Sequence, residues 1–465
     1  MQQQLIVKYP AIMKAEFEYI FNIILSDFLG LCFCYSNHEH DYVEIVTSDS
    51  EKSLKFDTTF FLNASSNWLN SSTLPIIPLE NWNPSDDKIS VDLVKPSIPI
   101  IFGSKGVSKS ENCWYVNLDI FGSIFFMISR YEESVRQERD NHNRFPAYAS
   151  ISAKSNFLER PIVDEYVEIL WTCIHSLWPK LNRKKRKFKK FITCDVDVPF
   201  DPLRLSLFKT ARRSASDILK RKSLKLAIQK WKFYFGNKFN IEQPDQCRDM
   251  IDWIMTKNEK LGNKVAFYFI TESTSNFDLK YNFDSKSMRM LFKNIYDRGH
   301  EIGIHPGYEC YKNNVLFNKS VLTLKRILDE EGINQDILGG RMHYLRWEPT
   351  QTPTLWDTHD IDYDSTLSFA EVSGFRCGTS HEFTMFDLKK RSSFKLKQRP
   401  LINMECTIIS DAYEGLGNSK EAFERFRNFS DLCKKYDGNY TLLWHNTSLE
   451  KPEERALYLQ VLNHS

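Results

Sequence analysis

The feature that most limits the fold is the alternation of short apolar segments with amphipathic ones over residues 186–447. Segments such as "KKFITCDVDV" (189–198) and "NKVAFYFIT" (263–271) have the length of buried strands. Between them, "PDQCRDMIDWIMTKNEKLG" (244–262) carries apolar residues at helical spacing. Strands that alternate with helices pair in parallel, with the helices outside the sheet. The sequence therefore predicts an α/β fold here, with a complete or incomplete (β/α) barrel.

The first 183 residues lack this alternation, and they predict a mixed α+β domain. We expect a helix near 11–29, strands around "YVEIVTS" (42–48) and "IPIIFG" (98–103), and a helix near 121–136. A further helix in 160–181 is followed by the charged run "NRKKRKFKK" (182–190), which is typical of a solvated linker. The chain is also too long for one ordinary core. We therefore predict two domains, at 1–183 and 184–465.

Polar side chains follow several of the expected strands. In parallel α/β folds the functional residues gather at the C-terminal ends of strands. The residues with ionisable side chains at such positions are Asp195, Asp197, His305, Arg341, His343, Asp364 and His445. Each has an ordinary structural explanation when taken alone, such as a helix cap or a hydrogen-bonded histidine. Their common placement favours a functional site at one face of the fold.

The acidic pair at the end of the first of these strands carries most of this argument. An unpaired carboxylate is costly to bury, so Asp195 and Asp197 require partners. Residues two apart in a strand point to the same side, which allows both carboxylates to face the site while Val196 points into the packing.

Five segments in order resemble the motifs of the NodB-homology polysaccharide deacetylases, carbohydrate esterase family four. They are "TCDVDVP" (193–199), "GHEIGIHPGYE" (299–309), "GGRMHYLRW" (339–347), "DYDSTLSF" (362–369) with "GFRCGT" (374–379), and "LLWHN" (442–446). "RYEE", "RFPA" and "RPIVDEY" in the first domain are similar to a bacterial subgroup with an extra N-terminal domain of uncharacterised role. The resemblance covers about residues 190–447. It implies a barrel of the polysaccharide-deacetylase type.

The resemblance also implies an activity and the roles of individual residues. The activity is metal-dependent hydrolysis of a carbon–nitrogen (amide) bond, which removes an N-acetyl, or alternatively an O-acetyl, group from a sugar or glycan precursor in cell-surface polysaccharide biosynthesis. Asp195 matches the general base, His445 the general acid, Arg341 the cation that orients the base, and Asp364 the carboxylate of the fourth motif. Asp197 and His305 match metal ligands. The metal expected is Zn²⁺, with Mn²⁺ or Fe²⁺ as alternatives.

Two positions depart from the family pattern. The family has HxxxH where this chain has His305 followed by Glu309, so the third ligand is either Glu309 or His343, with Cys310 ranked below both. The family usually has an acidic residue where this chain has Asn446, which leaves Asp364 as the nearest candidate to support His445.

Aromatic residues and a basic insertion accompany these motifs. Four aromatic residues near the expected site are candidates to stack on a sugar ring, with core packing as an equal alternative: Tyr308, Tyr344, Trp347 and Trp444. The insertion at about 201–240 follows the acidic strand end directly. Its basic residues predict contact with substrate phosphate or carboxylate groups or with an anionic membrane surface, or else a solvated helix face: Arg212, Arg213, Lys220, Arg221, Lys222 and Lys225.

Composition limits the partners and the location. The chain has 62 Lys and Arg against 60 Asp and Glu, a formal charge of +2, so no overall field attracts nucleic acid. The start of the sequence has no signal-peptide pattern, and no apolar stretch is long enough to span a bilayer. We therefore expect a cytoplasmic protein without a transmembrane segment.

Two other functions remain open on the sequence. A deacetylase-like domain that has lost its metal and only binds sugar is consistent with Glu309 and Asn446. A nucleotide-sugar glycosyltransferase would use the "DVD" of 195–197 to hold Mn²⁺ on a diphosphate. That scheme gives no role to His305, Arg341 or His445, and it ranks last.

Overall fold

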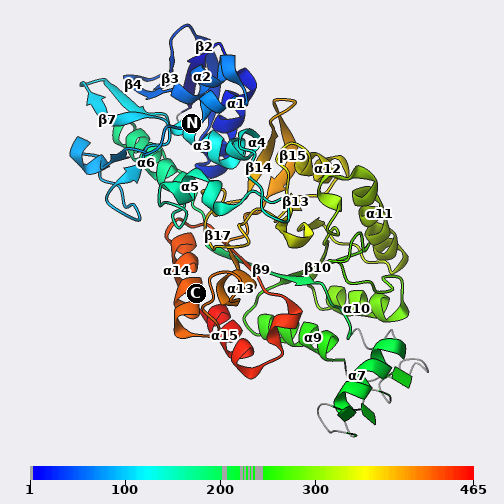
Figure 1. The fold of residues 1–465 in the computed structure, drawn as a ribbon. Coiled ribbons are helices and arrows are strands. Elements are labelled where there is room, and N and C mark those ends of the chain that lie inside the picture. The colour runs from blue at the N-terminus through cyan, green and yellow to red at the C-terminus, as the bar shows by residue number, and fades with distance from the viewer. Residues whose placement is uncertain are drawn as a thin grey trace. The chain divides into compact units, whose positions relative to one another are not determined.

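The computed structural model describes residues 4–201, 207–219, 224, 227–228, 231, 234–235 and 245–464 (Figure 1). The chain divides into two compact units. Unit 1 comprises Met1–Lys190, Tyr344–Gly417 and Glu424–Leu442, and unit 2 comprises Phe191–His343, Asn418–Phe423 and Leu443–Ser465. Residues 344–417 thus group with the N-terminal part of the chain, and the two domains expected from the sequence stay a prediction.

The N-terminal part of unit 1 contains a six-stranded mixed sheet in the order β2-β1-β3-β4-β8-β7. β1 pairs in parallel with β2, and β4 with β8, whereas the other neighbours are antiparallel. The strands are β1 (Leu5–Pro10), β2 (Phe33–His38), β3 (Tyr42–Thr47), β4 (Ser50–Asp57), β7 (Gly103–Lys109) and β8 (Cys113–Leu118). A separate two-stranded antiparallel sheet consists of β5 (Asn81–Trp82) and β6 (Ile98–Pro99). In β3, buried and half-buried residues alternate, as expected for a strand with one face in a core.

Helices accompany this sheet, so the mixed α+β content expected for this part is confirmed. They are α1 (Lys14–Phe21), the π-helix η1 (Asn22–Phe28), α2 (Thr59–Asn67), α3 (Ile120–Ile128), α4 (Tyr131–Val135), α5 (Ile151–Lys154) and α6 (Ile162–Leu177), with 3₁₀ turns η2 (Ser71–Thr73), η3 (Pro84–Asp87) and η4 (Ala147–Ala149). The helix expected near 121–136 is broken into α3 and α4 at Arg130, whose φ of 57° interrupts the helix.

The later segments of unit 1 carry the remaining strands and a buried ion-pair network. The elements are α12 (Thr352–Thr358), β13 (Tyr363–Asp364), β14 (Phe383–Asp387), β15 (Ser392–Gln398), β16 (Asn403–Met404), α13 (Glu405–Ile409) and most of α14 (Lys420–Lys435) and β17 (Asn439–Leu443). Arg376 of "GFRCGT" lies 2.6 Å from the carboxylate of Glu133 in "RYEE", and Arg130 lies 2.8 Å from the same carboxylate. All three side chains are buried. These motif residues therefore join distant parts of unit 1.

Unit 2 has the alternating architecture expected from the sequence. Its parallel strands are neighbours in the order β9 (Lys189–Val196), β10 (Val265–Phe269), β11 (Glu301–Ile304) and β12 (Gly339–Gly340). The helices between and after them are α7 (Leu207–Leu219), α9 (Gln246–Glu259), α10 (Lys286–Asp297), α11 (Asn314–Glu330) and α15 (Pro452–Asn463), with 3₁₀ turns η6 (Cys310–Lys312), η7 (His343–Leu345) and η8 (Asn446–Leu449). The α/β class is confirmed. Closure of the strands into a barrel stays a prediction.

The strands of unit 2 are buried on both faces, which explains their nearly continuous apolar sequence. All five residues of β10 are buried. A glycine is required where strands approach closely: a Cβ on Gly303 of β11 would lie 2.5 Å from the carbonyl oxygen of Gly339. None of the helices in the described part of the chain is long and apolar enough to cross a membrane.

Candidate metal centre

The acidic pair at the end of β9 lies where the sequence placed it, and the two carboxylates have different surroundings. Asp195 is only 2% exposed, whereas the side chain of Asp197, just past the strand, is 30% exposed. Nη1 of Arg341 donates to Oδ1 of Asp195 at 2.6 Å, and Nη2 donates to the Thr193 hydroxyl at 3.1 Å. Thr193 and Asp195 thus face the same side of β9, as the two-residue period of a strand requires.

Arg341 supplies the partner that buried Asp195 needs. Its side chain is fully buried, and its guanidinium lies over the ring of Tyr268, 5.1 Å from the ring centre. Tyr268 is the residue of β10 that pairs in register with Asp195. The salt bridge and the aromatic face together hold Arg341 in one orientation, and this in turn orients Asp195.

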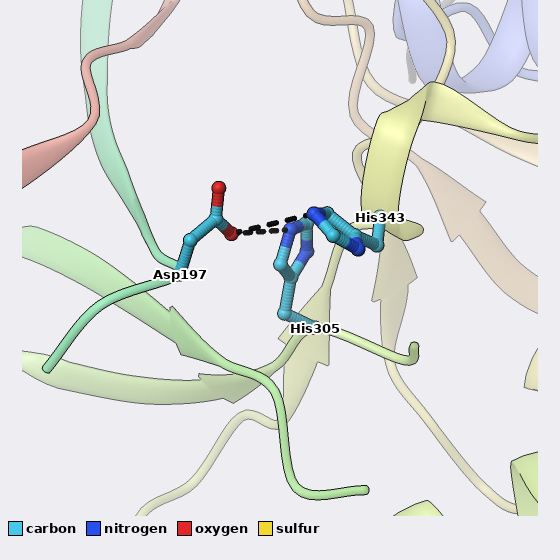
Figure 2. A group of neighbouring side chains, drawn as sticks. All are labelled: Asp197, His305 and His343. Atoms are coloured by element: carbon cyan, nitrogen blue, oxygen red, sulfur yellow. Dashed lines mark ion pairs between the residues drawn. The ribbon is translucent and has the colours of Figure 1, made fainter. Parts of the chain in front are cut away.

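Three side chains from three separate strand ends converge beside this pair. Figure 2 shows the carboxylate of Asp197 facing the rings of His305 and His343. Oδ1 of Asp197 lies 3.4 Å from Nε2 of His305 and 3.7 Å from Nε2 of His343. The three ligand atoms all lie within 4.8 Å of one another.

This group fits a divalent cation. Ligands at roughly 2.0–2.1 Å from a tetrahedral zinc ion lie about 3.3 Å apart, close to the spacings seen here. Oδ1 of Asp197 is shielded from solvent and accepts no hydrogen bond from the described residues, although a buried carboxylate oxygen normally has a partner. One carboxylate with two imidazoles suits Zn²⁺ and also Mn²⁺ or Fe²⁺.

The second nitrogen of each imidazole is held by an oxygen. Nδ1 of His305 donates to the backbone carbonyl of Arg341 at 2.6 Å, and Nδ1 of His343 lies 2.7 Å from Oδ1 of Asp278. Each acceptor favours a proton on Nδ1, so that in a neutral ring the lone pair of Nε2 lies on the side of Asp197, where a cation would bind.

The charges of the group shift its pKa values in opposite directions. Burial lowers the pKa of His305, but the carboxylates of Asp195 and Asp197 outweigh that effect and raise it above its usual value. Burial raises the pKa of Asp197, but the nearby His343, His305 and His445 outweigh it and hold the pKa below its usual range. The group therefore favours an ionised Asp197.

Asp278 contacts one member of this group, His343, and was not among the residues expected from the sequence. It lies in the polar run "TESTSNFD" (271–278) that follows β10, outside the family-like motifs. Burial raises its pKa, but hydrogen bonds from His343 and from the backbone amides of Tyr308 and Thr274 lower it to about 2. The only sequence signal for it is that it lies in the segment after a strand of the parallel sheet, and this does not indicate the direction of its side chain.

His445 approaches the other oxygen of Asp197. Its Nε2 lies 4.0 Å from Oδ2 of Asp197, and its side chain is 18% exposed. The backbone around it is fixed: the amide of Trp444 donates to the carbonyl of Thr193 at 3.0 Å, and the side-chain amide of Asn446 donates to the carbonyl of Val198 at 2.9 Å. Asn446 thus holds the backbone beside the end of β9, which explains an amide at this position.

Other residues expected at the site are not among the three members of this group. Among the described residues, Glu309 is not part of the three-residue group, and its backbone amide donates to the hydroxyl of Thr274 at 2.9 Å. Cys310 is a buried thiol whose sulfur lies 3.6 Å from the hydroxyl of Ser320. Asp364 belongs to unit 1, where its carboxylate accepts a hydrogen bond from the backbone amide of Thr366 at 2.8 Å.

The four aromatic candidates differ in exposure. Tyr308 is buried, and its ring centre lies 4.4 Å from that of Phe277, whereas the buried ring of Trp444 packs on Tyr458. In unit 1, Trp347 is buried and Tyr344 is partly exposed. The stacking roles stay predictions.

The basic insertion is described only in part. Arg212 lies exposed on α7. Arg213 belongs to α7, but its side chain is not described, and the other basic residues named for this insertion lie outside the described residues: Lys220, Arg221, Lys222 and Lys225.

The fold and site define an α/β protein with a candidate centre for a divalent metal. The model of a family of unknown function, DUF7033, matches residues 5–179. Among solved structures, the chain is similar to a protein from Mycobacterium smegmatis that is described as a polysaccharide deacetylase. The identity is 14% and the TM-score 0.39, over 60% of this chain and 84% of that one. No curated protein shows significant similarity to the sequence.

Proposed function

We propose that this chain is a metal-dependent hydrolase that removes the acetyl group from the nitrogen of an N-acetylated sugar, with an O-acetyl group as the alternative. One observation carries the proposal: Oδ1 of Asp197 faces two imidazole nitrogens beside a second carboxylate, Asp195, that is held by a buried arginine. Asp197, His305 and His343 would hold a divalent metal, which when bound polarises an acyl carbonyl and activates water for attack.

Asp195 is suited to act as the general base. Its Oδ1 is occupied by Arg341, and its Oδ2 lies 3.7 Å from Nε2 of His305, on the side of the candidate ligands. A carboxylate fixed in this way can take a proton from water positioned next to the ligand group. Arg341 keeps the base oriented without competing for the same oxygen.

His445 is suited to act as the general acid. It lies near the group and is partly exposed, so a substrate can reach it. The negative charge of Asp197 stabilises the protonated ring, which can then give its proton to the leaving nitrogen of the sugar. Base and acid would thus lie on two sides of the Asp197 carboxylate.

A sugar substrate is favoured by an exposed aromatic surface next to the site. Phe277 is 50% exposed, precedes Asp278 in the chain and packs against Tyr308. Aromatic rings of this kind stack on the apolar faces of sugars. The resemblance of the five sequence motifs to polysaccharide deacetylases supports an acetylated glycan precursor in bacterial cell-surface polysaccharide biosynthesis. A cytoplasmic location is a separate part of the proposal.

The proposal is tested with the purified full chain by metal analysis and by acetate release from N-acetylated sugars. We expect about one transition-metal ion per chain, which is lost in Asp197→Ala. Asp195→Asn should keep the metal and lose activity by about a hundredfold or more, since it removes the base. Full turnover in Asp195→Asn would contradict the assigned base. Absence of bound metal would favour a sugar-binding module, and metal binding only with a nucleotide-sugar would favour a transferase.

A further inference from the structure

We propose that Asp278 is a positioning residue for the candidate metal centre: it fixes the ring of His343 so that Nε2 would be free to bind a cation beside Asp197, and it thereby sets metal affinity. This inference rests on the proposed metal-dependent function. Asp278 comes from a loop after β10, and it touches His343 rather than the group's shared centre. A carboxylate behind a metal-binding imidazole orients the ring and strengthens the ligand.

The surroundings of Asp278 show that it is an acceptor and not a further ligand. Oδ1 lies 2.7 Å from Nδ1 of His343 and accepts from the amide of Tyr308 at 2.9 Å. Oδ2 accepts from the amide of Thr274 at 2.7 Å, from its hydroxyl at 2.8 Å and from the amide of Ser275 at 3.0 Å. The side chain is fully buried. A carboxylate has about four acceptor sites, so these donors fill it.

The loop after β10 and the segment after β11 pack closely, and this places the hydrogen-bond donors around Asp278. A Cβ on Gly307 would lie 2.9 Å from Oδ2 of Asp278 and 2.6 Å from the carbonyl oxygen of Glu272. Only glycine permits this approach, and it places the amide of Tyr308 on Asp278. The glycine of "HPGYE" therefore supports the second imidazole of the centre through Asp278.

The orientation of the His343 ring depends on a side chain, that of Asp278, whereas the orientation of the His305 ring depends on a main-chain group. Nδ1 of His305 is held by a main-chain carbonyl, which no substitution removes. The backbone amide of His343 donates to the carbonyl of Pro306 at 3.2 Å, which fixes the main chain, and Asp278 fixes the ring. Without the carboxylate the ring can rotate or move its proton to Nε2, and either change removes a ligand.

The chain offers a matched control. Glu259 and His300 form a second carboxylate–histidine pair in unit 2, with Nε2 of His300 3.1 Å from Oε1 of Glu259. His300 precedes β11, whereas His305 follows it, so this pair lies at the other end of the strand. Glu259→Gln therefore removes the same kind of interaction away from the centre.

The experiment is titration of the metal-free full chain with Co²⁺, followed by visible absorption, and with Zn²⁺ in competition. We expect Asp278→Asn to lower the affinity for both metals by about tenfold to a hundredfold and to change the absorption spectrum of bound Co²⁺. Glu259→Gln should leave the affinities and the spectrum unchanged. In a His343→Ala background, Asp278→Asn should have no further effect, because its partner is gone.

Each other result overturns the inference. Unchanged affinity in Asp278→Asn, while the wild-type chain binds metal, refutes the role of Asp278 and leaves the proposed function standing. An equal loss in the His343→Ala background shows that Asp278 acts on the fold. A wild-type chain that binds neither metal refutes the centre itself.

A second measurement does not depend on the variant's folding. Histidine-selective ¹⁵N NMR of the Zn²⁺-loaded wild-type chain should show His343 protonated on Nδ1 and without a proton on Nε2, and the opposite arrangement also overturns the inference.

Discussion

The buried ion-pair network of unit 1 allows a stability prediction of defined size. Burial raises the pKa of Glu133, but Arg376 and Arg130 outweigh that effect and lower it from the ordinary 4.5 to about 2. At about 1.36 kcal/mol for each pKa unit, this difference corresponds to about 3 kcal/mol of stability. Because the carboxylate is fully buried, solvent screening does not reduce this figure appreciably. Glu133→Gln should therefore lower the free energy of unfolding at pH 7 by about 3 kcal/mol.

The same pKa gives the direction of the pH dependence. The pKa of Glu133 in the folded chain lies below that in the unfolded chain, so the unfolded chain binds more protons between about pH 4.5 and pH 2. The stabilisation is complete above about pH 4.5, and it disappears as the pH falls through that range. Glu133→Gln should show a smaller loss of stability on acidification than the wild-type chain does.

Urea denaturation followed by circular dichroism measures both effects, since urea does not screen charges. Glu330→Gln is a suitable control because Glu330 pairs with Arg326 and Arg289 at the surface of unit 2, where such pairs contribute little. A destabilisation by Glu133→Gln below about 1 kcal/mol, or an unchanged acid dependence, would show that the network does not hold unit 1 together as described.

Two further predictions concern the site. His445→Gln should lower kcat by about a hundredfold, because it removes the general acid. The metal content should stay at the wild-type level, because His445 lies outside the group of Asp197, His305 and His343. Loss of the metal in this variant would show that His445 is a ligand. Phe277→Ala should raise KM for an N-acetylated oligosaccharide about three- to tenfold with little change in kcat, because the exposed ring is removed. Phe277→Trp should keep KM near the wild-type value. Equal KM values in the wild-type chain and both variants would exclude stacking on this ring.

Local patterns in the sequence were sufficient for the elements and for part of the site. The apolar run at Val265–Phe269 predicts a buried strand on its own, and β10 is that strand. The two-residue period of a strand predicts that Asp195 and Asp197 face one side. Functional residues of parallel α/β folds lie at the C-terminal ends of strands, and this rule predicts His305 and His343 as site residues. Both belong to the observed group.

The features that sequence reasoning missed depend on contacts between distant segments. Spacing alone could not choose between Glu309 and His343, since the choice depends on where β11 and β12 place the residues that follow them. Asp278 lies nine residues past β10, at a distance for which no strand or helix period gives a direction. The grouping of 344–417 with the N-terminal segment involves ion pairs such as Arg376–Glu133, which join residues 243 positions apart.

The three candidate ligands follow three different strands, so the geometry of the centre depends on how the sheet is assembled. In an HxxxH arrangement both imidazoles come from one local segment, whereas here Asp197, His305 and His343 follow β9, β11 and β12. Backbone hydrogen bonds hold the two histidine-bearing segments in register: the amide of Arg341 donates to the carbonyl of Ile304, and that of His343 to the carbonyl of Pro306. The ligand spacing is therefore a property of the parallel sheet, so a cation bound by all three residues would tie three strands together. Such a cation stabilises the folded unit in proportion to the logarithm of its concentration, because the unfolded chain lacks the sheet that assembles the ligands.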